Sequence, residues 1–553
     1  MMIQGTTAAR VLDVLEAAGV RVAFGLPGVH NLPFWDDLDE SGARSSGDDA
    51  LRILGVRHEQ TAGYAADGLA RATGGLGVAL VTSGPGAANT LAAFGEASAS
   101  GVPLLVIASD VPERLRDRTR VRGLLHESKD PGAWFSPLAK ATLQPTTPTE
   151  AVEAVVIAVE TALSQPRGPV YVGIPSDVLA TPAPAGRPIH VAPPLDPDPQ
   201  QILALAELVN GARQPLLWVG GGAVDSGAAA AIDALAWRLG APVLCTYAAR
   251  GTLRPGHPLL VDAPPHEPAV RELMAAADLL IGIGSAFDGM TTANWSLPRP
   301  ARVADINLAP SGAFEPDVVV RADALRAIDA LAIRLRSREP WADSPFRIRD
   351  QVHRSAAADV HTKAAISLVE TLESAWPEEH AVVCDMAVAG YWMGGYAAVH
   401  QPRRLLYPVG WGTLGYGLPA AIGVAAAGVP CLAVVGDGGI AMGLGELATL
   451  TQEELPVTVL VVDDGGYGML RFDQQRADRA GRGVDLDSPR WNQLGSAFGL
   501  PVDEPASLDD LRNVVAWSAL SGAPRMIVHR AALYPPRSTS PRWADGPDTV
   551  KHS

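Results

Sequence analysis

Short apolar runs recur along the whole chain, and an Ala-rich stretch of helical character follows most of them. The first third contains VRVAFGL, GVALVTS, PLLVIAS and PVYVGIP, the middle contains PLLWVGG and LLIGIGS, and the last third contains AVVCDM, PCLAVVGD and VTVLVVDD. Runs that are apolar on both faces are typical of strands in parallel sheets, which helices cover on both sides. We therefore expect an α/β fold in which each domain is a mostly parallel sheet flanked by helices.

Two segments interrupt this alternation and predict linkers. Residues 181–200 contain seven prolines and no apolar period, so we expect them to be extended, and residues 337–350 form the second segment. A chain of 553 residues is too long for one hydrophobic core. The expected units are a domain over 1–180, a domain over 200–336, a domain over 351–533 and a tail over 534–553. We assign no regular structure to the polar tail, and we expect residues 39–50 to form a surface loop.

Composition and charge narrow the class of protein. Hydrophobic residues make up 47% of the chain and charged residues 19%, as in a well-buried globular protein. The net charge of -16 gives the chain no electrostatic reason to bind nucleic acid or an anionic membrane. The cysteines Cys245, Cys384 and Cys431 lie in apolar runs without metal-ligand spacing. We therefore expect a reducing compartment, the cytoplasm.

One uncharged run, residues 418–435, is long enough to resemble a membrane span. Pro419, Gly423, Gly428 and Pro430 interrupt it, which predicts a helix, a turn and a buried strand instead. The first twenty residues lack the basic flank and the apolar centre of a signal peptide, and they predict an amphipathic helix.

Two aspartates follow apolar strands near the end of the chain. Asp437 follows one strand and Asp464 follows the next, 27 positions later, which is about the length of one strand–helix–strand unit. Adjacent parallel strands would bring both carboxylates to the carboxyl edge of the sheet, where ligands bind in open α/β sheets. Magnesium prefers one or two carboxylates together with phosphate oxygens. The pattern predicts a site for magnesium and a phosphate, whereas GDGG taken alone is an ordinary turn.

The glycines beside Asp437 suit the same ligand. Gly436, Gly438 and Gly439 would let a phosphate approach the backbone at the start of the following helix, where free N–H groups favour anions.

The segment from VVGDGG to VVDDGGYGML closely resembles the cofactor motif of thiamine-diphosphate enzymes. The resemblance implies that Asp437, Asp464 and the backbone carbonyl of Gly466 hold Mg²⁺, and it places Tyr467 beside the cofactor. The sequence departs from the commoner motif at Asp463 and Asp464, which replace two asparagines. An aspartate is an acceptable hard ligand, so magnesium binding stays compatible with the sequence.

Glu59 lies at the junction of a predicted strand and a predicted helix. Taken alone, it is a carboxylate that the helix dipole would stabilise. Its context, RHEQTAGYAADGLARATG, strongly resembles the segment that carries the catalytic glutamate in the acetolactate synthase and 2-oxo acid decarboxylase superfamily. The resemblance implies that Glu59 hydrogen-bonds a ring nitrogen of the aminopyrimidine and thereby activates the cofactor, which supplies the electron sink.

Two further motifs match the superfamily. SGPGAANTL and GWGTLGYGLPAAIG are similar to turns that lie near the pyrimidine ring, and Leu414 matches the bulky residue that supports the bent cofactor. The implied cofactor contacts are Gly84, Pro85, Asn89, Gly412, Leu414, Gly436, Gly438, Gly439 and Tyr467. The resemblance covers nearly the whole chain. It implies pyrimidine-binding, central and diphosphate-binding domains in that order, and a homodimer or homotetramer with sites between subunits.

The resemblance also places residues beside a 2-oxo acid substrate. We expect catalytic roles for His30 in PGVHNL and for His126 and Glu127 in LLHESKD, since histidine suits proton transfer near neutral pH. Each histidine taken alone is equally well explained as a surface or capping residue. The expected substrate contacts are Val29, Met469, Leu470 and Asp473.

The expected substrate class depends on one position at which this chain differs from the acetolactate synthases that it resembles. Where housekeeping acetolactate synthases have a substrate-contacting tryptophan, this chain has Asp473, and Arg471 adds a charge nearby. A carboxylate suits a polar or cationic substrate better than a small apolar one, unless Asp473 simply faces solvent. We expect a thiamine-diphosphate-dependent lyase or transferase, a decarboxylase or carboligase, that acts on a 2-oxo acid other than the branched-chain precursors.

Three alternatives stay open. A true acetolactate synthase would also bind FAD near a GARFDD motif, which is GSAFDG here with Ala286 in place of arginine, so FAD lacks support from the sequence. A flavin or nicotinamide oxidoreductase would explain GIGS, a weak dinucleotide signal, but not Glu59 together with Asp437 and Asp464. A cofactor-binding protein without catalysis would usually have lost the glutamate.

Overall fold

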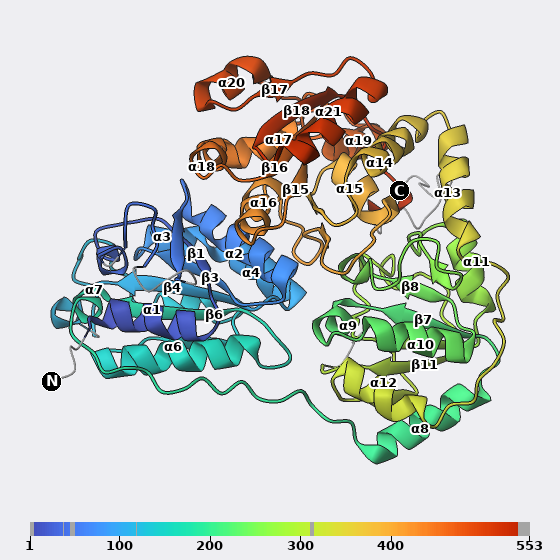
Figure 1. Cartoon of the computed structure of the whole chain (residues 1–553), viewed down its shortest axis with the longest axis horizontal. Helices are drawn as coiled ribbons and strands as arrows, with labels where there is room; N and C mark the ends of the chain where they lie inside the picture. The colour runs from blue at the N-terminus through green and yellow to red at the C-terminus, as the bar shows by residue number, and fades with distance from the viewer. Residues whose placement is uncertain (1–4, 37, 45–49, 118, 310–313, 540–553) are drawn as a thin grey trace.

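Three six-stranded sheets form the framework of this computed structural model, and every pairing between their strands is parallel. Figure 1 shows one sheet in each of three bodies, which are coloured blue to teal, green to yellow, and yellow to red along the chain. The expected α/β class with parallel sheets and flanking helices is confirmed. The structure describes residues 5–36, 38–44, 50–117, 119–309 and 314–539.

The N-terminal sheet has the strand order β2-β1-β3-β4-β6-β5. Its strands are β1 (Val22–Gly25), β2 (Arg52–Gly55), β3 (Gly77–Val81), β4 (Leu104–Asp110), β5 (Ala141–Leu143) and β6 (Val170–Pro175). Its helices are α1 (Thr7–Ala17), α2 (Glu59–Thr73), α3 (Pro85–Asn89), α4 (Leu91–Ser100), α5 (Gly132–Phe135), α6 (Pro148–Leu163) and α7 (Ser176–Leu179), with 3-10 turns η1 (Leu32–Phe34) and η2 (Glu113–Leu115). The amphipathic helix expected at the start of the chain is α1. Of the loop expected at 39–50, residues 45–49 lie outside the described residues.

The central sheet has the order β12-β11-β10-β7-β8-β9. Its strands are β7 (Pro215–Val219), β8 (Val243–Cys245), β9 (Leu260–Val261), β10 (Leu279–Ile283), β11 (Arg302–Ile306) and β12 (Val318–Val320). Its helices are α8 (Pro199–Gly211), α9 (Gly221–Asp225), α10 (Ala229–Leu239), α11 (Pro268–Ala276) and α12 (Ala324–Ala332), with the 3-10 turn η3 (Tyr247–Ala249). Residues 183–198 form neither helix nor strand, and they cross from the N-terminal domain to α8 as an extended segment (Figure 1).

The C-terminal sheet has the order β14-β13-β15-β16-β18-β17. Its strands are β13 (Ala381–Cys384), β14 (Leu405–Leu406), β15 (Cys431–Gly436), β16 (Val457–Asp463), β17 (Val502–Asp503) and β18 (Arg525–Arg530). Its helices are α13 (Arg347–Ala358), α14 (Lys363–Ala375), α15 (Val388–Tyr396), α16 (Gly417–Ala426), α17 (Asp437–Ile440), α18 (Leu447–Gln452), α19 (Gly468–Arg476), α20 (Trp491–Phe498) and α21 (Leu508–Ser521), with 3-10 turns η4 (Ala441–Glu446) and η5 (Arg537–Thr539).

The uncharged run at 418–435 forms a helix, a turn and a buried strand. It comprises most of α16 and most of β15, as its prolines and glycines predicted. Within the described part of the chain, no helix has the length and apolar character needed to cross a membrane. Of the tail, residues 534–539 lie against α15, where the Trp392 indole N–H donates to the Tyr534 carbonyl at 2.8 Å, and residues 540–553 lie outside the described part.

Helices α2 and α16 join the N-terminal and C-terminal domains into one hydrophobic core. A Cβ on Gly68 would overlap the backbone of Ala420, and a Cβ on Gly423 would overlap the carbonyl of Ala65. The two backbones therefore approach more closely than side chains would permit. Small residues at both positions are a requirement of this packing.

We expect Gly423→Ala to destabilise the chain because its new methyl group must push α16 away from α2. Overpacking of this kind costs about 1–3 kcal/mol, so the thermal unfolding midpoint should fall by at least ~3 °C. Gly55→Ala is the matched control, since no atom lies within 4 Å of a Cβ at Gly55. Equal unfolding midpoints for the two variants would show that the helix contact tolerates a methyl group.

Candidate active site

The strongest candidate site lies at the carboxyl edge of the C-terminal sheet. The chain order reverses between β13 and β15, which is the position where open α/β sheets bind ligands. β15 pairs with β16 so that Gly436 lies opposite Val462. The register brings Asp437, which follows β15, beside the two aspartates that end β16. The sequence-based expectation that two strand-end aspartates share one edge is met by this geometry.

Asp437 is buried without hydrogen-bond donors. Its side chain is 4% exposed, and neither carboxylate oxygen has a hydrogen-bond partner among the described residues. Burial raises the pKa of Asp437, and the charge of Asp463 raises it further. Burial and the neighbouring Asp437 likewise raise the pKa of Asp464 to about 6. A buried carboxylate without a donor, placed beside a second and partly buried carboxylate, is costly unless a cation lies between them, so this site fits a divalent metal.

A cavity of about 220 Å³ opens beside these carboxylates. It is lined by Met386, Ala387, Val388, Ala389, Tyr391, Gly412, Leu414, Gly436, Asp437, Gly438, Gly439, Val462, Asp464, Gly466, Tyr467, Gly468, Met469, Leu470, Ala531 and Leu533. A Cβ on Gly438 would lie 2.7 Å from the Tyr467 ring, and one on Gly439 would lie 2.8 Å from Asp385 Oδ2. Only glycine leaves room at these positions for the backbone to approach an anion.

Side chains alone do not provide a complete set of metal ligands at this site. Across the described residues, no three His, Cys, Asp or Glu side chains gather in a way that could hold a metal ion. Asp437 and Asp464 would therefore need carbonyl and phosphate oxygens to complete a magnesium shell. Gly466, which lines the cavity with φ +151°, carries one such carbonyl. The residues present thus fit a magnesium diphosphate and not a metal held by protein side chains only.

Asp463 is turned away from the cavity, which explains how the chain tolerates two adjacent aspartates. Its carboxylate accepts from Ser488 Oγ at 2.6 Å, from the Trp491 indole N–H at 2.8 Å and from the Gly465 N–H at 3.1 Å, and Arg530 pairs with it at 3.3 Å. Although burial opposes them, these partners hold the pKa of Asp463 below its usual range. Only one of the two carboxylates, that of Asp464, lines the cavity.

Asp385 is a site residue that the sequence interpretation missed. It follows β13 at the same sheet edge, is 1% exposed, and accepts from the N–H groups of Met386 at 2.7 Å and Gly415 at 3.0 Å. It therefore fixes the loop that carries Gly412 and Leu414. Burial raises the pKa of Asp385 to about 6. The pattern that identified Asp437, an acid directly after an apolar run, is also present in AVVCDM and could have identified Asp385.

A second group of predicted residues gathers at the corresponding edge of the N-terminal sheet. Glu59 is the first residue of α2 and is 8% exposed, with the His58 side chain capping the helix. Asn89 Nδ2 donates to Glu59 Oε2 at 3.0 Å, and a Cβ on Gly86 would lie 3.3 Å from Glu59 Oε1. The short helix α3, which begins at Pro85, thus wraps around the carboxylate.

His30 and His126 meet through a serine. His30 Nδ1 lies 2.6 Å from Ser83 Oγ, and Ser83 Oγ lies 3.1 Å from His126 Nδ1. A hydroxyl can donate to one ring and accept from the other, so the three groups form one hydrogen-bonded chain. His30 and Ser83 follow β1 and β3, between which the chain order reverses. Burial lowers the pKa of His30, and the adjacent His126 lowers it further.

The backbone at His126 is sterically constrained. Two other residues expected at the site, Glu127 and Val29, are not part of this hydrogen-bonded chain. His126 has φ +67°, and a Cβ on Gly84 would lie 2.7 Å from His126 Cβ. The Glu127 carboxylate accepts from the N–H groups of Arg122 at 2.8 Å and Leu124 at 2.9 Å, so it closes its own loop. Val29 is 64% exposed.

The residues of the second group do not line the cavity at Asp437. The cavity at Asp437 is lined by residues 386–533, and Glu59, His30, Asn89 and His126 are not among them. Asp473 also does not line it, although it lies one helical turn beyond Met469 on α19. The structure therefore assembles two half-sites from the predicted residues and leaves Asp473 outside the cavity at Asp437.

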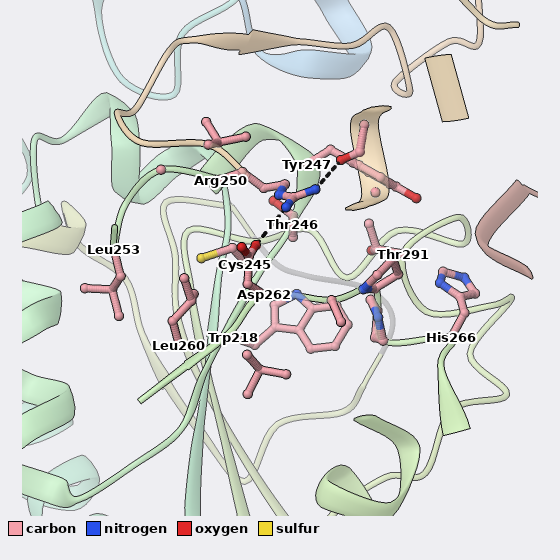
Figure 2. A pocket seen from close by; sticks show the side chains of 18 residues that line it. Trp218, Cys245, Thr246, Tyr247, Arg250, Leu253, Leu260, Asp262, His266 and Thr291 are labelled. Atoms are coloured by element: carbon pink, nitrogen blue, oxygen red, sulfur yellow. Dashed lines mark hydrogen bonds and ion pairs between the residues drawn. The ribbon is translucent and has the colours of Figure 1, made fainter. Parts of the chain in front are cut away.

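A separate cavity lies where the central domain meets the C-terminal domain (Figure 2). There Arg250 donates to the Gly394 carbonyl at 2.8 Å, to Asp262 Oδ1 at 2.7 Å and to the Ala397 carbonyl. These carbonyls belong to the end of α15, whose first residues line the Asp437 cavity. Arg250 thus anchors one wall of the candidate site from the central domain.

A true acetolactate synthase would hold a flavin near the motif that reads GSAFDG here, which directly follows β10 of the central sheet. The loops that follow β7 and β10 touch there, since the Gly222 N–H donates to the Gly284 carbonyl at 3.0 Å. The Trp218 indole N–H donates to Ser285 Oγ at 3.1 Å, and Ala286 contributes no charge. These contacts add no support for a flavin.

Comparison with known proteins decides the family. The model of the thiamine pyrophosphate enzyme N-terminal TPP binding domain matches residues 5–132, that of the central domain matches 202–331, and that of the C-terminal TPP binding domain matches 385–528. The chain belongs to the thiamine pyrophosphate enzymes. It is a thiamine-diphosphate-dependent enzyme, and its half-sites lie in the two matched TPP binding domains.

Named relatives of this thiamine pyrophosphate enzyme cover nearly its full length. It is 35% identical over 94% of its own chain and 92% of the relative to a probable 2-ketoarginine decarboxylase, AruI, of Pseudomonas aeruginosa. It is 28% identical to a probable acetolactate synthase large subunit of Methanocaldococcus jannaschii, over 94% of its own chain and 90% of the relative. An acetolactate synthase of Arthrospira platensis is 30% identical, over 90% of this chain and 89% of the relative.

We expect Asp437→Ala to abolish magnesium-dependent binding of thiamine diphosphate, whereas Asp464→Asn should bind it within about threefold of the parent. Asparagine keeps one oxygen ligand at position 464, and alanine keeps none at position 437. Calorimetric titration with the cofactor at fixed magnesium measures both. If Asp464→Asn binds no cofactor, the placement of the metal at these two residues is wrong.

Proposed function

We propose that this enzyme is a magnesium-dependent decarboxylase of a 2-oxo acid that carries a polar or cationic side chain. The observation that carries the cofactor part is the donor-free carboxylate of Asp437 beside Asp464 and a glycine-lined cavity. Asp437, Asp464 and the carbonyl of Gly466 would hold Mg²⁺ and, through it, the diphosphate. When bound, thiamine diphosphate supplies the electron sink for breaking the bond between the carbonyl carbon and the carboxylate.

The residues of the N-terminal half-site have separate tasks in this proposal. Glu59 binds a ring nitrogen of the aminopyrimidine, and Asn89 holds the Glu59 carboxylate in place at 3.0 Å. His30 and His126, joined through Ser83, deliver the proton that replaces the departing carboxylate. Met469 and Leu470 form the apolar wall of the opposite half-site.

Each complete site would need two copies of the chain, in a homodimer or a homotetramer. Within one chain Glu59 does not line the cavity that contains Asp437, which supports completion of the site by a second copy. Large apolar side chains near both half-sites are more than half exposed in the single chain. These side chains are Val29, Leu125, Trp411, Met442 and Leu470. Exposed apolar area of this kind is typical of surfaces that a partner covers.

The substrate class rests on the charge of Asp473, which is on the same helix as the cavity-lining Met469 and Leu470. Asp473 lies one helical turn from Met469, where an acidic group would attract a cationic substrate tail. The relative named as a probable 2-ketoarginine decarboxylase has a substrate with a guanidinium side chain, which agrees with an acid at this place. The proposal is therefore decarboxylation of a 2-oxo acid with a guanidinium or ammonium group.

Acetolactate synthesis with FAD is the second candidate, favoured by 28% and 30% identity to proteins with that name. It would place a small apolar acceptor beside Asp473 and a flavin beside Ala286. Neither residue favours those ligands chemically, so we rank this activity second.

We expect Glu59→Gln to keep thiamine diphosphate affinity within about threefold and to lose at least ~100-fold in turnover, which is typical of lost acid–base function. Steady-state rates and calorimetry on the same preparation measure both quantities. Near-normal turnover would refute the role of Glu59.

The same variant tests the shared site. Co-expression of Glu59→Gln with Asp437→Ala chains should recover roughly a quarter of the parent activity, because a mixed dimer contains one intact pair of half-sites. If Glu59 and Asp437 acted within one chain, the mixture would stay inactive.

We expect the parent to release carbon dioxide from 5-guanidino-2-oxopentanoate at least ~10-fold faster, by kcat/KM, than from pyruvate. Asp473→Leu should reduce that preference by about the same factor, since one lost charge contact changes discrimination by ~1–3 kcal/mol. Gln474→Leu, a polar-to-apolar change at the next position, is the control. Rapid acetolactate formation at sub-millimolar pyruvate would instead favour the second candidate.

A further inference from the structure

The loop after β16, which contains Asp464 and Gly466, would place a second carboxylate beside the bound metal. The negative charge of Asp464 must be balanced. Asp437 and Asp464 both face the cavity that would hold a diphosphate, which is itself a strong anion. A second aspartate strengthens the attraction for Mg²⁺ and weakens the attraction for the diphosphate, because like charges at close range repel. Asp463 is balanced by Arg530 and three donors. Asp464 needs a partner of its own.

Arg471 is the cation that lies beside Asp464. It lies on the first turn of α19, and its side chain turns back toward the loop. Nη1 donates to the Asp464 carbonyl at 3.2 Å and lies 3.7 Å from Asp464 Oδ2, and Nη2 donates to the Gly465 carbonyl at 3.0 Å. The side chain of Arg471 is 23% exposed and that of Asp464 is 13% exposed. At this depth the attraction is only partly screened by solvent.

The same arginine also fixes the shape of the loop. Gly465 has φ +74° and Gly466 has φ +151°, conformations that glycine adopts without strain. A Cβ on Gly466 would lie 2.9 Å from Arg471 Nη2, so the guanidinium packs directly on the residue whose carbonyl would bind the metal. Asp485, which is largely exposed, accepts from Arg471 Nε at 2.8 Å and orients the guanidinium from outside.

We propose that Arg471 is a positioning residue that makes an aspartate at position 464 compatible with a bound diphosphate. Its charge offsets that of Asp464 toward the diphosphate, and its two carbonyl contacts hold the loop that carries Gly466. Arg471 and Asp464 act as a coupled pair, in which an asparagine at 464 would remove the need for the arginine's charge. This inference rests on the proposed magnesium site and not on the identity of the substrate.

A double-mutant cycle tests the coupling. The variants are Arg471→Met, Asp464→Asn and the two changes together, and the measurement is calorimetric affinity for thiamine diphosphate at fixed magnesium. Arg471→Met should weaken binding at least ~10-fold, since it leaves a partly buried carboxylate uncompensated. The double variant should bind within about threefold of Asp464→Asn alone. Arg471→Lys, which keeps the charge, should retain at least about a third of the parent affinity.

Controls separate charge from loop structure and from the metal assignment. Arg479→Met removes an exposed arginine just beyond α19 and should leave the affinity unchanged. A double variant as weak as Arg471→Met would overturn the proposal, because loop support would then be the arginine's whole contribution. Parent-like binding by Arg471→Met, or equal losses for Arg471→Lys and Arg471→Met, would overturn it as well. Parent-like binding by Asp437→Ala would instead refute the magnesium site itself.

Discussion

The close contact between α2 and α16 constrains both half-sites. Gly68 lies against the backbone of Ala420, and Gly423 lies against the carbonyl of Ala65, so the helix separation is set by backbone atoms. Glu59 begins α2, and the loop with Gly412 and Leu414 leads directly into α16. A change in this contact would therefore move the activating carboxylate and the pyrimidine-side loop together.

A buried polar network fixes the same contact in one register. Arg71 on α2 pairs with Asp67 at 2.7 Å and with Glu96 at 2.9 Å, and the Tyr416 hydroxyl donates to Asp67 at 2.8 Å. The second oxygen of Glu96 accepts from the Trp411 N–H at 2.9 Å. Burial raises the pKa of Asp67, whereas Arg71 opposes the rise. Buried ion pairs add little to the stability of the fold, but any arrangement that leaves one buried charge unpaired is strongly destabilised. This network therefore favours one position for the loop before α16.

The sequence was sufficient for features that depend on local pattern. Runs that are apolar on both faces predicted parallel strands, and acids directly after two such runs predicted Asp437 and Asp464 at one sheet edge. The sequence was insufficient where the direction of a side chain depends on partners that are distant along the chain. Asp463 and Asp464 look equivalent along the chain, yet Ser488, Trp491 and Arg530, contributed by later segments, draw only the first of them away from the cavity.

Contacts between residues far apart in the sequence also explain which site residues the sequence pattern missed or misplaced. Asp385 acts through the N–H groups of a loop some thirty residues later in the chain, and Ser83 matters because two histidines from different loops meet at its hydroxyl. Glu127 looked like a catalytic acid, and its role stays a prediction, but its carboxylate is occupied by two backbone N–H groups.

The two half-sites differ in the ionisable groups that they bury. The C-terminal half concentrates carboxylates and would need a metal to neutralise them, whereas the N-terminal half contains one buried glutamate and two histidines. Burial and mutual repulsion lower the pKa of His30, which favours a neutral ring at physiological pH. The Ser83 hydroxyl joins His30 to His126, so a proton can pass between the two rings.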